Sequence, residues 1–253
     1  MCFGALAAQP GVGRTYERSS GIVVEQLVAG PFLLAKESGK LAPGLLSVSP
    51  CLASIVPDSW TIEWVKVDET ERVTRAADFG IDAHHLPDAI RWATDHLDGG
   101  GFAWPNLFLN AGAARDFRRR FVSATVRLLQ MSLAERFLEP FLALSTPPPQ
   151  QPGYAPVGSI GVHEAVAQRS ALTDLGERRG FEVLGFDGAA GFDSFRCNAL
   201  EGDFQRLFGV QFNQWGLIDD GGDAVRCAEF ANSPGVSTCA VAWHPWLVIE
   251  HAL

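Results

Sequence analysis

The spacing of hydrophobic positions changes repeatedly along the chain, and these changes predict both helices and strands. Several segments repeat apolar residues every three to four positions, which is typical of a helix that packs on one face. Capping residues and terminal glycines support these segments, for example Asp68 before the first and Gly180 after the fourth. Helices are therefore predicted over 68–79, 86–97, 113–121, 162–179, 200–208 and 224–232.

Other segments are rich in β-branched and aromatic residues and predict strands. They are 21–36, 59–67, 102–109, 181–186, 192–198, 214–218 and 241–250. Gly30 and Pro31 interrupt the first segment and divide it into two short strands. Pro245 lies in the last segment, and because proline donates no backbone hydrogen bond, that strand is expected at a sheet edge or a bulge. Segment 125–144 is apolar and fits either a strand or a helix.

The elements alternate at irregular spacing, which favours an α+β fold with a mixed or mainly antiparallel sheet and helices packed on it. Residues 146–156 read TPPPQQPGYAP, and so many prolines exclude a helix or a central strand there. This Pro-rich connector divides a near-neutral half, 1–145, from an acidic half, 157–253. The second half would make a marginal core of about 100 residues alone, so we expect the two halves to form one packed unit.

The net charge of the 253-residue chain is −9, and the charge is unevenly distributed. Residues 1–150 carry a balance of −2, and residues 151–253 carry a balance of −7. This argues against a broad contact with nucleic acid or an anionic membrane, because both require a cationic surface. It suits a basic protein partner instead. Arginine outnumbers lysine 17 to 3, which fits a GC-rich bacterial genome.

The five cysteines are odd in number, and no two have the Cys-x-x-Cys spacing. A zinc site, another metal site or a disulfide framework is therefore not expected, nor is a cofactor. The N-terminus carries no basic region before its apolar residues. The charge-free segment 41–57 is interrupted by prolines and reads as buried loop and short strand, not as a membrane span. We therefore expect a soluble protein in the reducing cytoplasm.

Four residues are candidates for chemistry in a cleft beside the connector. Asp187 and Asp193 flank the glycine-rich stretch 188–191, where carboxylates can act as acid–base groups or simply form a turn. His163 opens the helix predicted after the connector and fits either an acid–base role or a solvated first turn. Cys197 is a further candidate for the same site.

Asp219, Asp220 and Asp223 form an acidic run before a predicted helix. They do not match a calcium-binding EF-hand loop, because Gly221 and Phe230 occupy ligand positions of that pattern. An N-cap followed by acids that suit the helix dipole explains the run. The same three carboxylates are candidates for contact with a basic partner.

A basic cluster, consisting of Arg115, Arg118, Arg119 and Arg120, lies in the predicted helix 113–121. Its guanidinium groups suit a phosphate or an acidic partner. They equally suit acidic side chains of the second half of the same chain. The balance of −7 in that half favours this intramolecular pairing.

Two functions fit these observations. The first is a non-catalytic interaction protein that binds a basic partner, because the chain is acidic and carries no standard catalytic motif. Bacterial immunity proteins, which neutralise toxins that are often basic, have this general character. The second is an enzyme or small-ligand-binding protein that uses Asp187, Asp193 and His163 in a cleft near the connector.

Overall fold

The structure is a computed structural model of the 253-residue chain. It describes residues 26–35, 41–49, 81–82, 84–96, 101–103, 107–123, 125–144, 162–163, 166–168, 176–187, 191–237 and 241–253. The predicted strand 59–67, the predicted helix 68–79 and the Pro-rich connector 146–156 lie outside the described residues.

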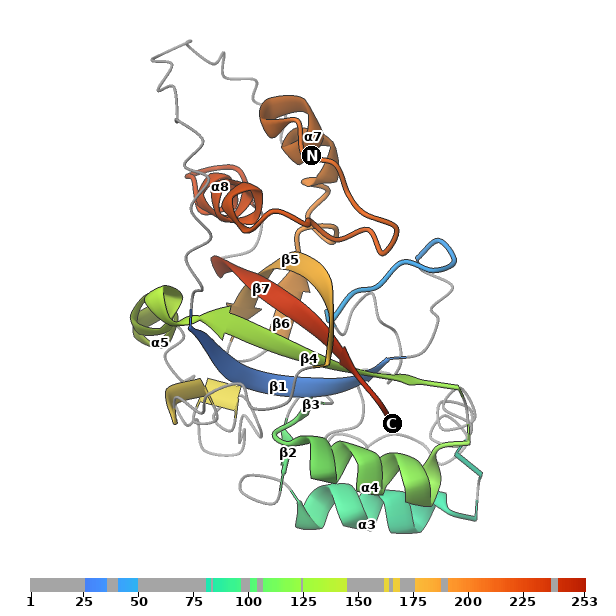
Figure 1. Ribbon diagram of the computed structural model, residues 1–253. Coiled ribbons are helices and arrows are strands. Elements are labelled where there is room, and N and C mark those ends of the chain that lie inside the picture. The colour runs from blue at the N-terminus through green and yellow to red at the C-terminus, as the bar shows by residue number, and fades with distance from the viewer. Residues whose placement is uncertain are drawn as a thin grey trace, which may run out of the picture.

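Seven strands form one sheet in the order β2-β3-β1-β4-β7-β5-β6. They are β1 (Leu27–Ala35), β2 (Phe102–Ala103), β3 (Leu107–Phe108), β4 (Arg127–Ala134), β5 (Glu177–Asp187), β6 (Gly191–Ser194) and β7 (Ala242–His251). Every pair of neighbours is antiparallel. The predicted α+β class, with a mainly antiparallel sheet, is therefore confirmed. The long β4 and β7 lie side by side at the centre of the sheet (Figure 1).

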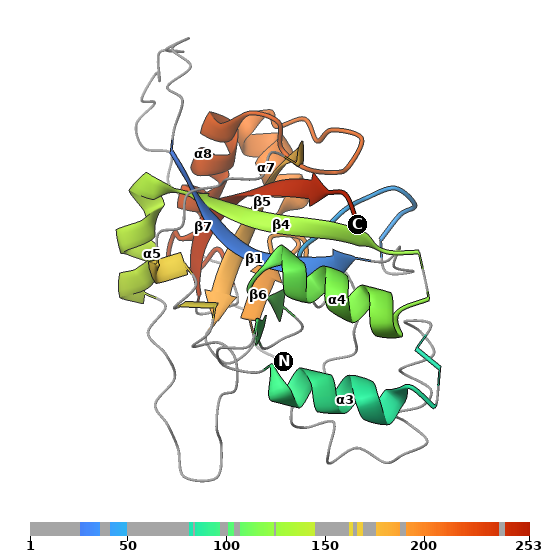
Figure 2. The same cartoon turned by 60° about the horizontal axis from the view of Figure 1, so that its bottom comes forward.

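Helices cover the sheet in three places. They are α3 (Leu86–Asp95), α4 (Ala111–Phe121), α5 (Leu138–Leu144), α7 (Glu201–Phe208) and α8 (Gly221–Ala231), and a 3-10 turn, η2 (Glu135–Phe137), leads into α5. Figures 1 and 2 both show α7 and α8 together on one side of the molecule, and α3 and α4 together at the opposite end. Segment 125–144 thus contains both a strand and a helix.

Two glycines explain departures from the predicted strands. Gly30 lies at a bulge where β1 shifts register against β4, so residues 27–35 form one continuous strand and not two short ones. A side chain at Gly30 would overlap the backbone of Met131, which leaves room only for glycine. Gly180 has a φ of +128° and lies at a second bulge inside β5. The predicted helix 162–179 is therefore wrong at its end, because Glu177 already belongs to β5.

The expectation that Pro245 marks a sheet edge is also wrong. β7 has neighbours on both sides, since it pairs with β4 and with β5. The pairing with β4 begins at Trp246, so Pro245 lies just beyond it and pairs only with Val183 of β5. A proline is tolerated in this central strand because it stands where the pairing between β7 and β4 has ended.

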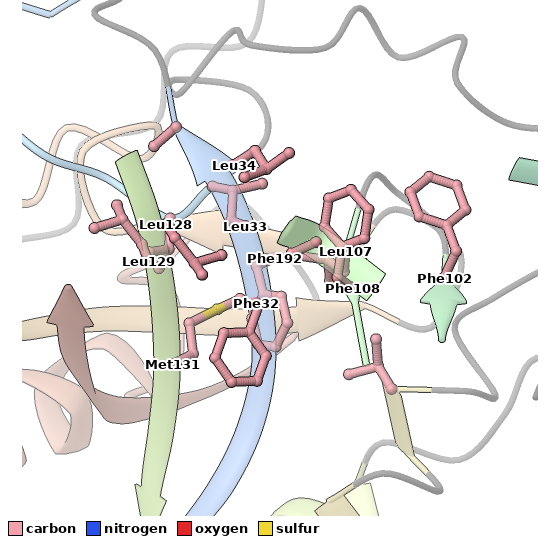
Figure 3. Close-up of a cluster of buried hydrophobic side chains, with 14 of the residues drawn as sticks. Phe32, Leu33, Leu34, Phe102, Leu107, Phe108, Leu128, Leu129, Met131 and Phe192 are labelled. Atoms are coloured by element: carbon pink, nitrogen blue, oxygen red, sulfur yellow. The ribbon is translucent and has the colours of Figure 1, made fainter. Parts of the chain in front are cut away.

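The buried apolar side chains form two separate hydrophobic cores. The larger core joins β1, β3, β4 and α5, and Figure 3 shows its leucine and phenylalanine side chains between neighbouring strands. At the α3–α4 end, the Trp92 ring lies 5.1 Å from Phe117 and stacks on His96 at 3.9 Å between ring centroids. The smaller core lies between β5, β7 and the helices α7 and α8, around Phe195, Phe204 and Trp243.

No helix among the described residues is long and apolar enough to cross a membrane.

Candidate functional site

The helices α7 and α8 and the loop between them form a surface of concentrated negative charge, here called the acidic layer (residues 201–232). It contains six acidic residues and two arginines, which gives a net charge of −4. The acids are Glu201, Asp203, Asp219, Asp220, Asp223 and Glu229. The layer packs on the sheet through buried apolar side chains such as Phe204 and Cys227, so its charged side chains are left on the outside.

The three predicted partner-binding aspartates lie at the start of α8. Asp220 is the N-cap, and its carboxylate accepts a hydrogen bond from the backbone N–H of Asp223 at 2.9 Å. Asp223 forms an ion pair with Arg226, one turn further along the helix. Asp219 accepts a hydrogen bond from the side-chain amide of Asn213 at 2.6 Å. Each carboxylate thus has an internal contact, and Asp219 and Asp220 remain exposed.

The outer side of α7 combines charge with an exposed apolar residue. Asp203 and Arg206 form an ion pair at 2.6 Å, and both side chains are exposed. Leu207 is 44% exposed, and only Leu253 is a comparably exposed large apolar residue among those the structure describes. Because Asp203 and Leu207 are four residues apart, they lie on the same side of the helix. The outer side of α7 therefore offers an exposed apolar side chain next to a carboxylate.

The basic cluster of α4 does not pair with the acidic half in the way we expected. Arg119 and Arg120 form ion pairs with Asp116 of their own helix, at 2.5 and 2.8 Å. Arg115 donates hydrogen bonds to the backbone oxygen of Ala252 at 3.0 and 3.2 Å. The predicted pairing with acidic side chains is wrong for Arg119 and Arg120, because a carboxylate one turn away on the same helix is nearer than any on the acidic layer.

Asp116 connects this helix to α3. It accepts a hydrogen bond from the indole nitrogen of Trp92 at 3.1 Å, in addition to its two arginine contacts. Burial raises the pKa of Asp116, but the hydrogen bonds from Arg120, Trp92 and Arg119 outweigh burial and lower the pKa below its ordinary value. The negative charge on Asp116 is thus part of the α3–α4 packing.

The residues predicted for a catalytic cleft are distributed over both faces of the sheet. Asp193 lies opposite Gly185 in the β5–β6 hairpin, and Asp187 lies opposite Gly191 two rungs further along. Directly paired residues share a face of the sheet. Asp193 and Asp187 therefore lie on the face of Gly185, which carries Trp243 and the smaller core.

His163 lies on the other face. Its ring stacks on Phe141 of α5 at 6.4 Å between ring centroids, and its Nε2 lies 3.3 Å from the backbone oxygen of Leu142. Phe141 belongs to the larger core. The strand register therefore separates His163 from Asp193, and the cleft that would combine them stays a prediction.

Cys197 is exposed in the turn 195–199 after β6, and its sulfur forms a disulfide. The other described cysteine, Cys227, is a free and buried thiol, so the partner of Cys197 lies outside the described residues. Burial raises the pKa of Cys227 to about 12, with nearby Asp223 adding to the increase. The expectation that the cysteines form no disulfide is wrong for Cys197, and the bonded sulfur is no nucleophile until it is reduced.

β5 carries a buried carboxylate that the sequence pattern did not predict. Glu182 is fully buried and accepts hydrogen bonds from Ser47 Oγ at 2.7 Å, Ser194 Oγ at 2.6 Å and the backbone N–H of Val48 at 2.8 Å. Among the described residues, no cationic side chain is paired with it. The sequence feature that indicates its burial is its position in the apolar segment FEVLGF, on the same side of the strand as Leu184.

His244 of β7 is a second buried titratable group. It is 6% exposed, and its Nε2 has no hydrogen-bond partner among the described residues. The ring lies against Phe137 and Phe141, at 5.9 and 6.1 Å between ring centroids. Burial in this aromatic surrounding lowers the pKa of His244 to about 4.

Among the described residues, no group of three or more histidine, cysteine, aspartate or glutamate side chains is placed to hold a metal ion. Comparison with known proteins gives no match: no family model fits the chain, and no curated protein or solved structure is significantly similar to it.

Proposed function

We propose that this is a non-catalytic interaction protein whose acidic layer binds a basic protein. The observation that carries the proposal is the separation of charge in space. The acidic layer has a net charge of −4 on one side of the sheet, and the arginine-rich helix α4 lies at the opposite end of the molecule (Figure 1). The acidic layer attracts a positively charged partner, and the arginines of α4 repel it. The partner is therefore oriented toward the acidic layer.

The predicted binding residues have complementary roles in this proposal. The exposed Glu229, Asp219 and Asp220, together with the partly exposed Asp203 and Asp223, supply the negative field. Leu207 supplies apolar area that can be buried against the partner. Charged groups at the rim of an interface mainly accelerate association and set specificity, and a buried apolar contact slows dissociation. A bacterial immunity-type protein that neutralises a basic toxin would use both the charged rim and the apolar contact.

The compartment is part of the proposal. A cytoplasmic location was expected from the cysteine pattern, but the disulfide of Cys197 favours an oxidising environment or a chain that responds to redox conditions. A partner that is exported, as many toxins are, fits either environment. The alternative function, a cleft that uses Asp187, Asp193 and His163, has no observation in its favour beyond the presence of those residues.

Affinity capture from the source cells tests the proposal. The bait is the wild-type chain, and captured proteins are identified by mass spectrometry at low and high salt. The test variant combines Asp203→Asn, Leu207→Ser and Glu229→Gln, none of which caps a helix. The control is Asp88→Asn, because Asp88 and Arg91 of α3 form an exposed ion pair with the same spacing as Asp203 and Arg206.

The proposal predicts that a basic protein is retained by the wild-type chain and by the control, and is lost with the test variant and at high salt. Retention of the same protein by the test variant would contradict it, as would an acidic captured protein. Turnover of a small molecule by the purified chain, abolished by His163→Ala, would favour the alternative function instead.

A further inference from the structure

Residues 135–144, which comprise η2 and α5 and are here called the α5 segment, pack on the sheet through aromatic rings. The segment directly follows β4 and lies at the margin of the molecule in both views (Figures 1 and 2). Phe141 lies 5.3 Å from Trp246 and 5.4 Å from Phe186 between ring centroids. Phe141 and Leu138 are both buried. The α5 segment therefore covers part of the sheet through a few apolar anchors.

His244 of β7 lies beneath this cover. Its ring contacts Phe137 of η2 and Phe141 of α5, and its buried Nε2 has no hydrogen-bond partner among the described residues. At this point β7 pairs with β5, in which Leu184 lies opposite His244. The α5 segment belongs to no ladder of the sheet. Moving the segment away is therefore the least costly way to bring water to the ring of His244.

The groups around His244 offer nothing to balance a positive charge on its ring. The charged side chains of the α5 segment are all exposed, and they are Glu135, Arg136 and Glu139. Arg136 lies over the Phe137 ring and would add a like charge. On β5 the acid on the same face is Glu182, which already accepts three hydrogen bonds. Burial is the cause of the lowered pKa of His244, and no described carboxylate opposes it.

A second histidine touches the α5 segment but is not enclosed in the same way. His163 also contacts the Phe141 ring, and its Nε2 lies 3.3 Å from the backbone oxygen of Leu142. A protonated ring nitrogen can donate to a carbonyl oxygen, so a proton on His163 is compatible with this contact. His163 is also partly exposed. A proton is therefore tolerated at His163 and not at His244.

We propose that the α5 segment is an acid-sensitive cover, which opens when His244 takes up a proton from solvent and closes when His244 releases it. The proton binds the ring nitrogen that lacks one and leaves an imidazolium. In the closed state this charge is buried against Phe137 and Phe141, whereas in the open state water hydrates it. Opening also uncovers the side of the Trp246 ring that Phe141 contacts. This inference does not depend on the proposed binding of a basic partner.

Proton linkage gives the direction and size of the effect. The pKa of His244 is about 4 in the closed state and 6.5 once the ring is hydrated, so the open state binds more protons between these values. The equilibrium between the closed and open segment should therefore shift toward opening by about 20-fold from pH 7 to pH 5. Below about pH 4 both states are protonated, and the shift should reach a plateau.

Hydrogen exchange of the full chain at pH 7 and pH 5, followed by NMR, tests the inference. Protection factors are compared, because they correct for the effect of pH on exchange itself. We expect the protection factors of Leu142 and Ala143 in α5 to be about 20-fold lower at pH 5. Because local opening exposes little surface, about 1 M urea should change them little, whereas urea should lower the protection factor of Met131 in β4.

His244→Phe should abolish the pH response of α5, because its ring takes up no proton. His244→Gln is neutral as well and gives the same test if the phenylalanine variant fails to fold. The matched control is His163→Gln, since His163 contacts the same Phe141 ring, and it should retain the response.

Equal protection of α5 at the two pH values in the wild type would overturn the inference. So would a pH response that persists in His244→Phe or His244→Gln. A loss of protection at Leu142 that increases with urea as much as that of Met131 would also overturn it, because the segment would then open only when the whole chain unfolds.

Discussion

The hydroxyl of Ser47 donates a hydrogen bond of 2.7 Å to the carboxylate of Glu182, although 135 residues separate the two in the sequence. Both side chains are buried, Ser47 at 3% exposure and Glu182 at 0%. A buried carboxylate without a cation beside it is tolerated only when hydrogen-bond donors surround it. The contact therefore ties an irregular segment from the first half of the chain to a strand of the second.

Replacing Glu182 should destabilise the fold strongly. Glu182→Ala leaves the hydroxyls of Ser47 and Ser194 and the N–H of Val48 without their acceptor, and we expect a loss of about 3–5 kcal/mol in the free energy of unfolding. Glu177→Gln on the same strand is the control, because Glu177 is exposed, and its effect should stay below about 0.5 kcal/mol. Urea denaturation measures both, and similar values for the two variants would contradict this assignment.

The buried His244 should make stability depend on pH. Its pKa falls from 6.5 in the unfolded chain to about 4 in the folded one, so the unfolded state binds more protons between these values. The free energy of unfolding should therefore decrease as the pH falls from 7 to 5, by about 2 kcal/mol from this group. His244→Phe should remove that component of the pH dependence, and His84→Gln, at an exposed histidine, should retain it.

Asp116 should stabilise the α3–α4 packing through its charge. Its pKa is lowered in the folded state, so its contribution is present above pH 4 and is lost as the pH falls through the folded pKa. Asp116→Asn removes two ion pairs and weakens the contact with Trp92, and we expect a loss of about 1–2 kcal/mol at pH 7. Asp88→Asn breaks one exposed ion pair and should cost less than about 0.5 kcal/mol. Thermal unfolding at pH 7 measures the loss of stability in each variant, and equal losses for Asp116→Asn and Asp88→Asn would contradict this role of Asp116.

Two glycines with similar backbone angles should respond differently to alanine. Gly216 and Gly235 have φ values of +71° and +80°, so both variants pay about 1 kcal/mol of backbone strain. At Gly216 the new methyl group would also overlap the guanidinium of Arg196, whereas at Gly235 it meets open space. We expect Gly216→Ala to cost about 3 kcal/mol in total. Equal effects at the two sites would contradict the close contact between Gly216 and the guanidinium of Arg196, which donates a hydrogen bond to the backbone oxygen of Gly216.

The local elements of this chain were predictable, and the long-range ones were not. The N-cap of α8 at Asp220 and the strand around Val183 follow from neighbouring residues, which is why the sequence predicts them. The central place of Pro245 depends on where the pairing of β7 with β4 ends, at Leu133, more than 100 residues away in the sequence. The disulfide of Cys197 likewise depends on which residues the fold brings together, so spacing along the chain did not reveal it.

The candidate site also has a part that neighbouring residues predict and a part that only the folded chain determines. The acidic run of Asp219, Asp220 and Asp223 is visible in the sequence, and the structure adds the exposed Leu207 on the neighbouring helix α7. Nothing in the spacing of leucines marks Leu207 as exposed, because its exposure depends on which side of α7 packs against Phe230 and the rest of the smaller core.

The most direct test of the central claim is the affinity between this chain and the basic protein that it captures, measured by calorimetry at low and high salt. We predict that the affinity falls as salt rises, and that Asp203→Asn combined with Glu229→Gln weakens binding about tenfold at low salt but little at high salt. Asp88→Asn should bind as the wild type does. An affinity that is independent of salt, and equal for the wild type and the double variant, would contradict binding by the acidic layer.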